Sequence, residues 1–288
     1  MQKNNNLSPL PFYTDMDEQN HRKSYAYGSI YPLYCPLGSV PPFQIIREHD
    51  DATITFVSLV KYGEGVATEV TEAMTGAGLQ IMRYAAYGYD VIIYPSTAPM
   101  NLTLTEGRYY LVITLSDDSQ YYSDIFTVVG DMSGFLQVQW WDLEDLVMDG
   151  GRIVYSTGYR NTLWLQTQLG KPDYDFQEEG EQRDGYFFPE KMISEKKYKC
   201  TILAPEYLCD VMRFIRMSDY INIRDQYGHM YHCDTFLCSP EWQEQGDLAS
   251  VGIEFTCDTV AKKIGKHYGA GYDFNDDYNN DYDNGANS

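Results

Sequence analysis

Four residues between His229 and Cys238 have the types and the close spacing of metal ligands. They are His229, His232, Cys233 and Cys238. Imidazole and thiolate groups hold a structural zinc ion only where they converge on one point. The same segment alternates with period two, which predicts a strand, and residues three apart in a strand project from opposite faces. His229 and His232 should therefore diverge, and we expect no metal and no cofactor in this protein.

The sequence lacks the signatures of the commoner catalytic sites. It contains no glycine-rich phosphate loop, no G-x-S-x-G elbow and no cysteine in a catalytic context. Pairs of carboxylates for glycoside hydrolysis can be chosen freely from 42 acidic residues, so such pairs have no weight. We therefore predict that the protein is not an enzyme, and a hydrolase of cell-wall sugars stays a third hypothesis.

The charge of the chain is strongly negative. Its 42 acidic residues outnumber 21 basic ones, which gives a formal net charge of −21. Such a chain repels a phosphate backbone and an anionic lipid surface, so we expect no direct binding to nucleic acid and none to a membrane. Self-repulsion that favours solubility explains the same charge without any partner.

The sequence also indicates where the protein is made. Residues 1–6 lack the apolar core of a signal peptide, and no run approaches the ~18 apolar residues of a transmembrane helix. We therefore expect synthesis and folding in a cytoplasm, where the six cysteines would stay free thiols.

Changes in composition along the chain predict a mainly β protein with two domains and two terminal segments. We expect an extended, proline- and tyrosine-rich arm over residues 1–50 and an immunoglobulin-like β-sandwich over residues 51–130. A second β-rich, α+β domain with one amphipathic helix should cover residues 131–268. Residues 269–288 form an acidic, low-complexity tail that cannot bury a core.

The sandwich prediction rests on β-rich runs that are separated by turn residues. Tyr109–Leu115 and Tyr121–Val129 flank the turn at Ser116–Ser119, which predicts a hairpin. The segment Leu104–Tyr109 resembles the tyrosine corner of immunoglobulin-like domains, in which a Tyr hydroxyl bonds to the backbone upstream.

The second domain is easiest to predict between residues 191 and 257. We expect a strand over Lys191–Leu203, a helix over Pro205–Met217, a hairpin over Tyr220–Cys238 and a strand over Leu248–Cys257. The helix follows from four apolar residues whose spacing puts them on one face: Leu208, Val211, Met212 and Ile215.

Four other segments of this domain give weaker signals. We expect one or two helical turns over Leu143–Val147, and a hairpin of Arg152–Tyr155 with Thr162–Gln168. Gly170–Gly185 is polar and acidic and should be a projecting loop. Two lysine clusters, at 196, 197 and 199 and at 262, 263 and 266, form either solvated faces or docking sites for an acidic surface of another copy, such as the loop near Glu178. We favour the solvated faces.

The arm combines six prolines with a large apolar surface. Proline blocks regular helices and central strands, and an irregular apolar segment needs a cover. Either the protein's own domains or a neighbouring copy can supply that cover, and we favour the neighbouring copy. The expected assembly residues are Tyr25, Tyr27, Tyr31, Leu33, Tyr34, Pro41, Pro42 and Phe43.

Several of these segments together resemble tail structural proteins of phages that infect Bacteroidetes, including the crAss-like phages. The resemblance lies in Tyr25–Tyr34 with Pro41–Phe43, in Gly107–Leu111 with Tyr121–Phe126, and in Tyr198–Val211 with Glu241–Trp242 and Gly246–Leu248. It implies a non-enzymatic β-sandwich component of an oligomeric ring in the tail, the baseplate or the portal-proximal region. The implied partners are copies of the chain and neighbouring tail proteins. The implied location is the virion, after synthesis in the host cytoplasm.

A glycan-binding module of a host-recognition apparatus is the alternative function. Sandwiches with exposed aromatic residues often present a flat platform to a sugar. The candidate platform consists of the four tryptophans Trp140, Trp141, Trp164 and Trp242, although we expect at least two of them to pack in a core.

Overall fold

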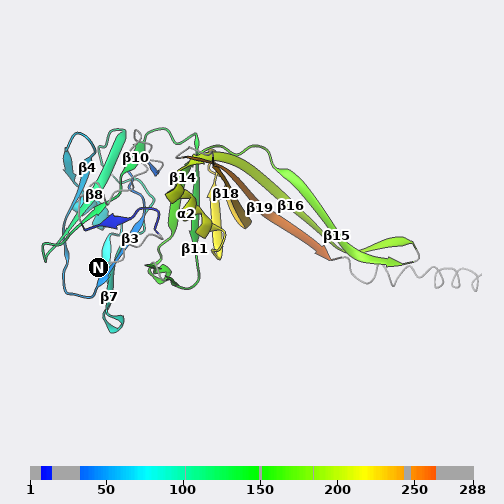
Figure 1. Ribbon diagram of the computed structural model, residues 1–288, viewed down its shortest axis with the longest axis horizontal. Helices are drawn as coiled ribbons and strands as arrows, with labels where there is room; N and C mark the ends of the chain where they lie inside the picture. Colours follow the sequence, from blue (N-terminus) through cyan, green and yellow to red (C-terminus); the bar gives the residue numbers. More distant parts are fainter. Residues whose placement is uncertain are drawn as a thin grey trace, which may run out of the picture.

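The computed structural model describes residues 8–14, 33–100, 102–148, 151–183, 185–242 and 248–263. These residues are mostly β-strands, and they include two α-helices, α1 (Thr71–Gly76) and α2 (Glu206–Ile215). The prediction of a mainly β fold with one amphipathic helix is confirmed, because α2 buries the expected apolar face while α1 is only six residues long. Figure 1 shows an elongated molecule with the first domain at one end and a long β-structure at the other.

The first domain contains two sheets that share one core. The larger sheet has seven strands, in the order β1-β9-β8-β10-β2, with β4 paired to β8 and β5 paired to β4. Their bounds are β1 Phe12–Tyr13, β2 Tyr34–Pro36, β4 Ile54–Lys61, β5 Ala67–Glu69, β8 Gly107–Leu115, β9 Gln120–Ser123 and β10 Phe126–Val129. The smaller sheet has the order β3-β7-β6, with bounds Phe43–Glu48, Tyr89–Tyr94 and Gln80–Tyr84.

The expected hairpin and tyrosine contact are both present in the larger sheet. β8 pairs with β9 across the predicted turn, with Val112 opposite Tyr122. The Tyr109 hydroxyl donates to the Thr105 carbonyl over 2.9 Å, which ties the start of β8 to the chain before it. The arrangement is a β-sandwich, and its immunoglobulin-like character stays a prediction.

The extended arm is wrong for the part of residues 1–50 that the structure describes. Those residues supply β1, β2 and β3, and Leu33, Pro41, Pro42 and Phe43 are buried in the protein's own core. The prolines are tolerated because β1 and β2 are short strands at the two ends of their sheet, where a missing N–H costs little. The predicted assembly residues Tyr25, Tyr27 and Tyr31 lie outside the described residues.

The second domain is built on one seven-stranded antiparallel sheet. Its order is β14-β11-β17-β18-β19-β16-β15. The bounds are β11 Phe135–Trp141, β14 Asn161–Gln166, β15 Asp173–Arg183, β16 Tyr186–Ala204, β17 Tyr220–Arg224, β18 Met230–Trp242 and β19 Ala249–Lys263. Helix α2 covers this sheet through Leu208, Val211, Met212 and Ile215, as their spacing predicts.

Two predictions for the part of this domain between β11 and β14 are wrong. Leu143–Val147 is not helical, because Leu146–Met148 forms strand β12 and pairs with β13 (Gly151–Ile153). The expected hairpin across Gly158 is absent for the same reason: β13 is taken by β12, and β14 pairs with β11 instead. A 3-10 turn over Tyr155–Thr157 with Gly158 at φ 81° separates β13 from β14.

The two domains are joined by buried contacts. Gln44 of β3 exchanges two hydrogen bonds with the Val154 backbone, Nε2 to the carbonyl at 2.7 Å and the N–H to Oε1 at 3.0 Å. Val91 and Ile93 of β7 pack in one apolar cluster with Val154 and with Phe214 of α2. The first domain therefore holds one end of the second domain in a fixed position.

Candidate functional site

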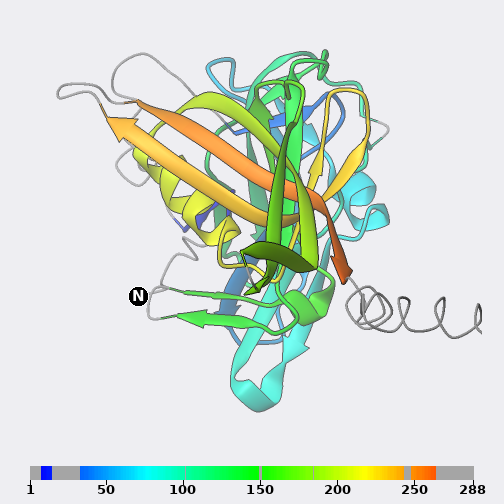
Figure 2. The same cartoon turned by 90° about the vertical axis from the view of Figure 1, so that its right-hand side faces the viewer.

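A three-stranded projection extends from the second domain. We call it the ribbon, and it consists of β15, residues 186–197 of β16 and residues 256–263 of β19. β16 pairs with β15 on one side and with β19 on the other. The whole of β16, with its 19 residues, spans roughly 60 Å at about 3.3 Å per residue. Figure 1 shows the ribbon leaving the body, and Figure 2 views the molecule from that end.

The predicted acidic loop over Gly170–Gly185 is therefore a strand, although it does project. Its alternation of Asp173, Tyr174, Asp175 and Phe176 is a period-two signal that the acidic composition obscured. The backbone of β15 is satisfied on one side by β16, so the segment does not need a core to be ordered.

One face of the ribbon carries apolar side chains with no layer over them. Phe176 of β15, Ser194 of β16 and Val260 of β19 stand in one row, and Tyr174 and Met192 lie two residues away on the same face. Tyr174 is 61% exposed, Phe176 70%, Met192 37% and Val260 64%. We call these four residues the apolar stripe. Contiguous exposed apolar groups of this kind mark contact surfaces more often than scattered ones do.

The lysines of β16 are paired inside the ribbon or its base. Lys191 lies 3.3 Å from Glu179, Lys196 lies 2.9 Å from Asp258, and both Lys197 and Lys199 reach Glu254, at 3.4 and 3.3 Å. These exposed pairs are each worth little. Acids of the same chain therefore pair with Lys196, Lys197 and Lys199, which could instead have bound an acidic surface of another copy.

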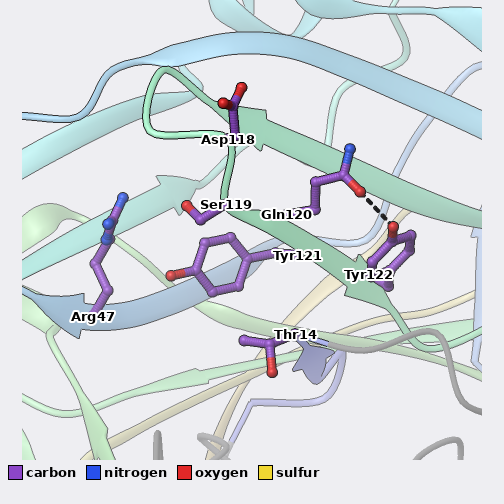
Figure 3. Close-up of a pocket in the computed structure, with 7 residues that line it drawn as sticks. All are labelled: Thr14, Arg47, Asp118, Ser119, Gln120, Tyr121 and Tyr122. Atoms are coloured by element: carbon purple, nitrogen blue, oxygen red, sulfur yellow. Dashed lines mark hydrogen bonds between the residues drawn. The ribbon is translucent and has the colours of Figure 1, made fainter.

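A shallow pocket lies at one edge of the first domain, between β1 and the β8–β9 turn. Its volume is about 460 Å³, and Figure 3 shows its lining residues Thr14, Arg47, Asp118, Ser119, Gln120, Tyr121 and Tyr122. Most of these residues offer hydroxyl or amide groups, and the Tyr122 hydroxyl donates to Gln120 Oε1 over 2.5 Å. The pocket was not predicted, because Arg47 was assigned to the arm.

Arg47 is held in this pocket by two acids. Its side chain is 6% exposed, and Nη2 donates to Asp50 and, over 3.0 Å, to Asp117. Burial opposes the charge, but the hydrogen bond to Asp117 and the nearby acids leave the pKa of Arg47 raised. Hydrogen bonds from Ser119 and Arg47 lower the pKa of Asp117 to about 2. Arg47 is buried while its two acids are about 40% exposed, and the three side chains form a clamp in the pocket wall.

The four tryptophans do not form a platform. Trp140 and Trp164 are buried in the core of the second domain, so the glycan-platform prediction is wrong for them. Trp141 stacks on Tyr220 with ring centres 5.2 Å apart, and the Arg160 guanidinium covers its ring at 4.2 Å. Trp242 is 47% exposed and pairs with Ala249 near the end of β18, away from the β17 end where Trp141 lies.

The two histidines of the metal-like segment have separate partners. His229 Nδ1 lies 3.0 Å from an Asp225 oxygen, and His232 Nδ1 lies 2.7 Å from Asn222 Oδ1. Within the described ranges, no three His, Cys, Asp or Glu side chains are grouped as a metal ion would require. A search of the same ranges for a helix with the length and apolarity of a membrane span finds none.

Comparisons with known proteins add little to this geometry. No protein-family model matches the chain, and no curated protein matches it either. Among solved structures, the chain is weakly similar to the protocadherin gamma B4 extracellular domain, at 8% identity and a TM-score of 0.12. The match covers 82% of this chain and 43% of that one, so the chain spans less than half the length of its neighbour.

Proposed function

We propose that this protein is a non-enzymatic structural subunit of a phage virion. It forms part of an oligomeric ring in the tail, the baseplate or the portal-proximal region, is made in the host cytoplasm and is incorporated into the particle. The sequence resemblance described above motivates the choice of a virion. The observation that carries the proposal is the ribbon, whose apolar stripe is exposed and lies outside the protein's own cores.

The ribbon replaces the N-terminal arm as the assembly element. The described arm residues are occupied in the protein's own sheets, whereas the apolar stripe has no cover among the described residues. A ring contact is heterologous, because each subunit presents one surface to the next subunit and a different surface to the previous one. An element that reaches away from the body suits such a contact, and we assign another copy of this chain as its partner.

Removal of the apolar stripe tests this function. We expect the double variant Tyr174→Ser, Phe176→Ser to keep its fold and to lose self-association, with a dissociation constant raised about a hundredfold for two buried aromatic groups. Sedimentation velocity over a concentration series measures this constant, and mass spectrometry of purified particles detects the chain in the virion.

Gln177→Ser is the matched control, since Gln177 directly follows Phe176 and lies on the opposite face of β15. A wild-type chain that stays monomeric at every concentration and is missing from particles would contradict the proposed function. Equal association of the double variant and the control would contradict the role of the stripe.

A further inference from the structure

The ribbon has two unpaired strand edges, one along each side. β15 is the last strand of the seven-stranded sheet, so its outer edge has no neighbour among the described strands. β19 pairs with β18 only as far as Cys257, and Thr259 is bonded to the Asp234 side chain. Residues 260–263 of β19 thus have a partner strand on the β16 side alone. Unpaired edges of this length are templates for another strand.

The two edges carry opposite charge. β15 contains five acids, Asp173, Asp175, Glu178, Glu179 and Glu181, and a single base, Arg183. The free edge of β19 ends in Lys262 and Lys263, which form no ion pair within the described part of the chain. Two β15 edges would repel each other, and so would two β19 edges, whereas β15 and β19 attract.

The heights of these charges along the ribbon also match. Glu178 and Lys262 both pair with Met192, from opposite sides of β16, and Glu179 and Lys263 both pair with Lys191. Phe176 and Val260 share Ser194 in the same way. Glu178 and Glu179 of β15 therefore stand level with Lys262 and Lys263 of β19, but β16 keeps the two pairs apart within one copy.

We propose that neighbouring copies join edge to edge, with β15 of one ribbon beside residues 260–263 of β19 in the next. This inference rests on the proposed ring and names its contact. β15 and β19 are both antiparallel to β16, so they run in the same direction. Copies related by rotation about an axis along the ribbons keep that direction, and the new pair of strands is parallel.

The pairing places complementary side chains opposite each other across the contact. Level rows bring Glu178 to Lys262 and Phe176 to Val260, so one charge pair and one apolar pair lie on the same face. Two different edges meet, so a pair of copies retains one free β15 edge and one free β19 edge. The contact therefore propagates from copy to copy and closes only as a ring, which an isologous pair of β15 strands would not do.

Reversal of single charges tests the pairing. Glu178→Lys places a lysine opposite Lys262 of the next copy, and Lys262→Glu places a glutamate opposite Glu178. We expect each variant alone to associate about tenfold more weakly than wild type, because a cross-strand attraction becomes a repulsion. An equimolar mixture of the two should recover association, and so should the double variant Glu178→Lys, Lys262→Glu.

Sedimentation velocity and native mass spectrometry of the full chain read out these results, and thermal unfolding checks that each variant folds. Asp210→Lys, on the exposed face of α2, is a control for a change of charge elsewhere. If wild type associates and the variants associate equally well alone, mixed or combined, the edge pairing is wrong while the ring stands. A monomeric wild-type chain overturns both.

Discussion

Strands β8 and β15 have similar patterns and opposite surroundings. In β8 the residues Tyr109, Leu111, Ile113 and Leu115 alternate with half-buried ones and are all buried in the sandwich. In β15 the aromatic residues also alternate, yet both are mostly exposed. The comparison teaches that alternation determines which face of a strand a side chain occupies. Whether a second layer covers that face depends on other elements of the fold.

The largest expected effect is a difference between the two strands in how much a substitution lowers the free energy of unfolding. Leu111→Ala removes a fully buried side chain from β8 and should lower the free energy of unfolding by about 3 kcal/mol. Phe176→Ala removes an exposed one from β15 and should change it by no more than about 0.5 kcal/mol. Urea denaturation followed by circular dichroism measures both, and similar losses would mean that the stripe is covered within the monomer.

An intermediate effect tests whether the buried region extends across the two domains. Gln44→Ala removes both hydrogen bonds to the Val154 backbone. The buried Val154 N–H loses its acceptor, while the Val154 carbonyl still accepts from Thr157 Oγ1, so we expect a loss of about 2 kcal/mol. Gln177→Ala on the ribbon is the matched control. A single unfolding transition shifted to lower urea would fit domains that unfold together, and an unchanged midpoint would refute the role of Gln44.

The smallest effect is a pH dependence that belongs to the first domain alone. The pKa of Asp117 is about 2 in the folded protein, against about 3.9 in an unfolded chain, so its contribution to stability is present above pH 4 and is lost as the pH falls toward 2. Asp117→Asn should reduce stability at neutral pH and flatten the acid limb. Urea midpoints from pH 2 to 6 measure this, with Asp210→Asn as a control, and an unchanged acid limb would exclude Asp117 as its source.

Local signals predicted the elements whose partners lie nearby in the sequence. The β8–β9 hairpin follows from its turn, and α2 follows from the spacing of its apolar face, so both could be predicted. The hydrogen bond from Tyr109 to Thr105 spans only four residues and could be predicted in the same way. In each case the physical cause lies within about ten residues.

Distant partners explain what the sequence could not predict. The pairing of β2 with β10 gives Tyr34 and Pro36 a place in a sheet that their proline-rich context argues against. β15 looked like a loop because its acids face solvent on an edge strand, and only β16 makes it a strand. The exposure of the stripe depends on a missing layer, which no local pattern encodes.

The parallel pairing of β2 with β10 also determines when the larger sheet of the first domain can be completed during synthesis. Tyr34 meets Thr127, and Phe12 meets Ser123, so the beginning of the chain completes its sheet only after a much later segment has left the ribosome. Contacts of such wide sequence separation form slowly, and apolar strands that wait for them are prone to aggregate. A nascent chain arrested before residue 120 should therefore be the form that needs a chaperone most.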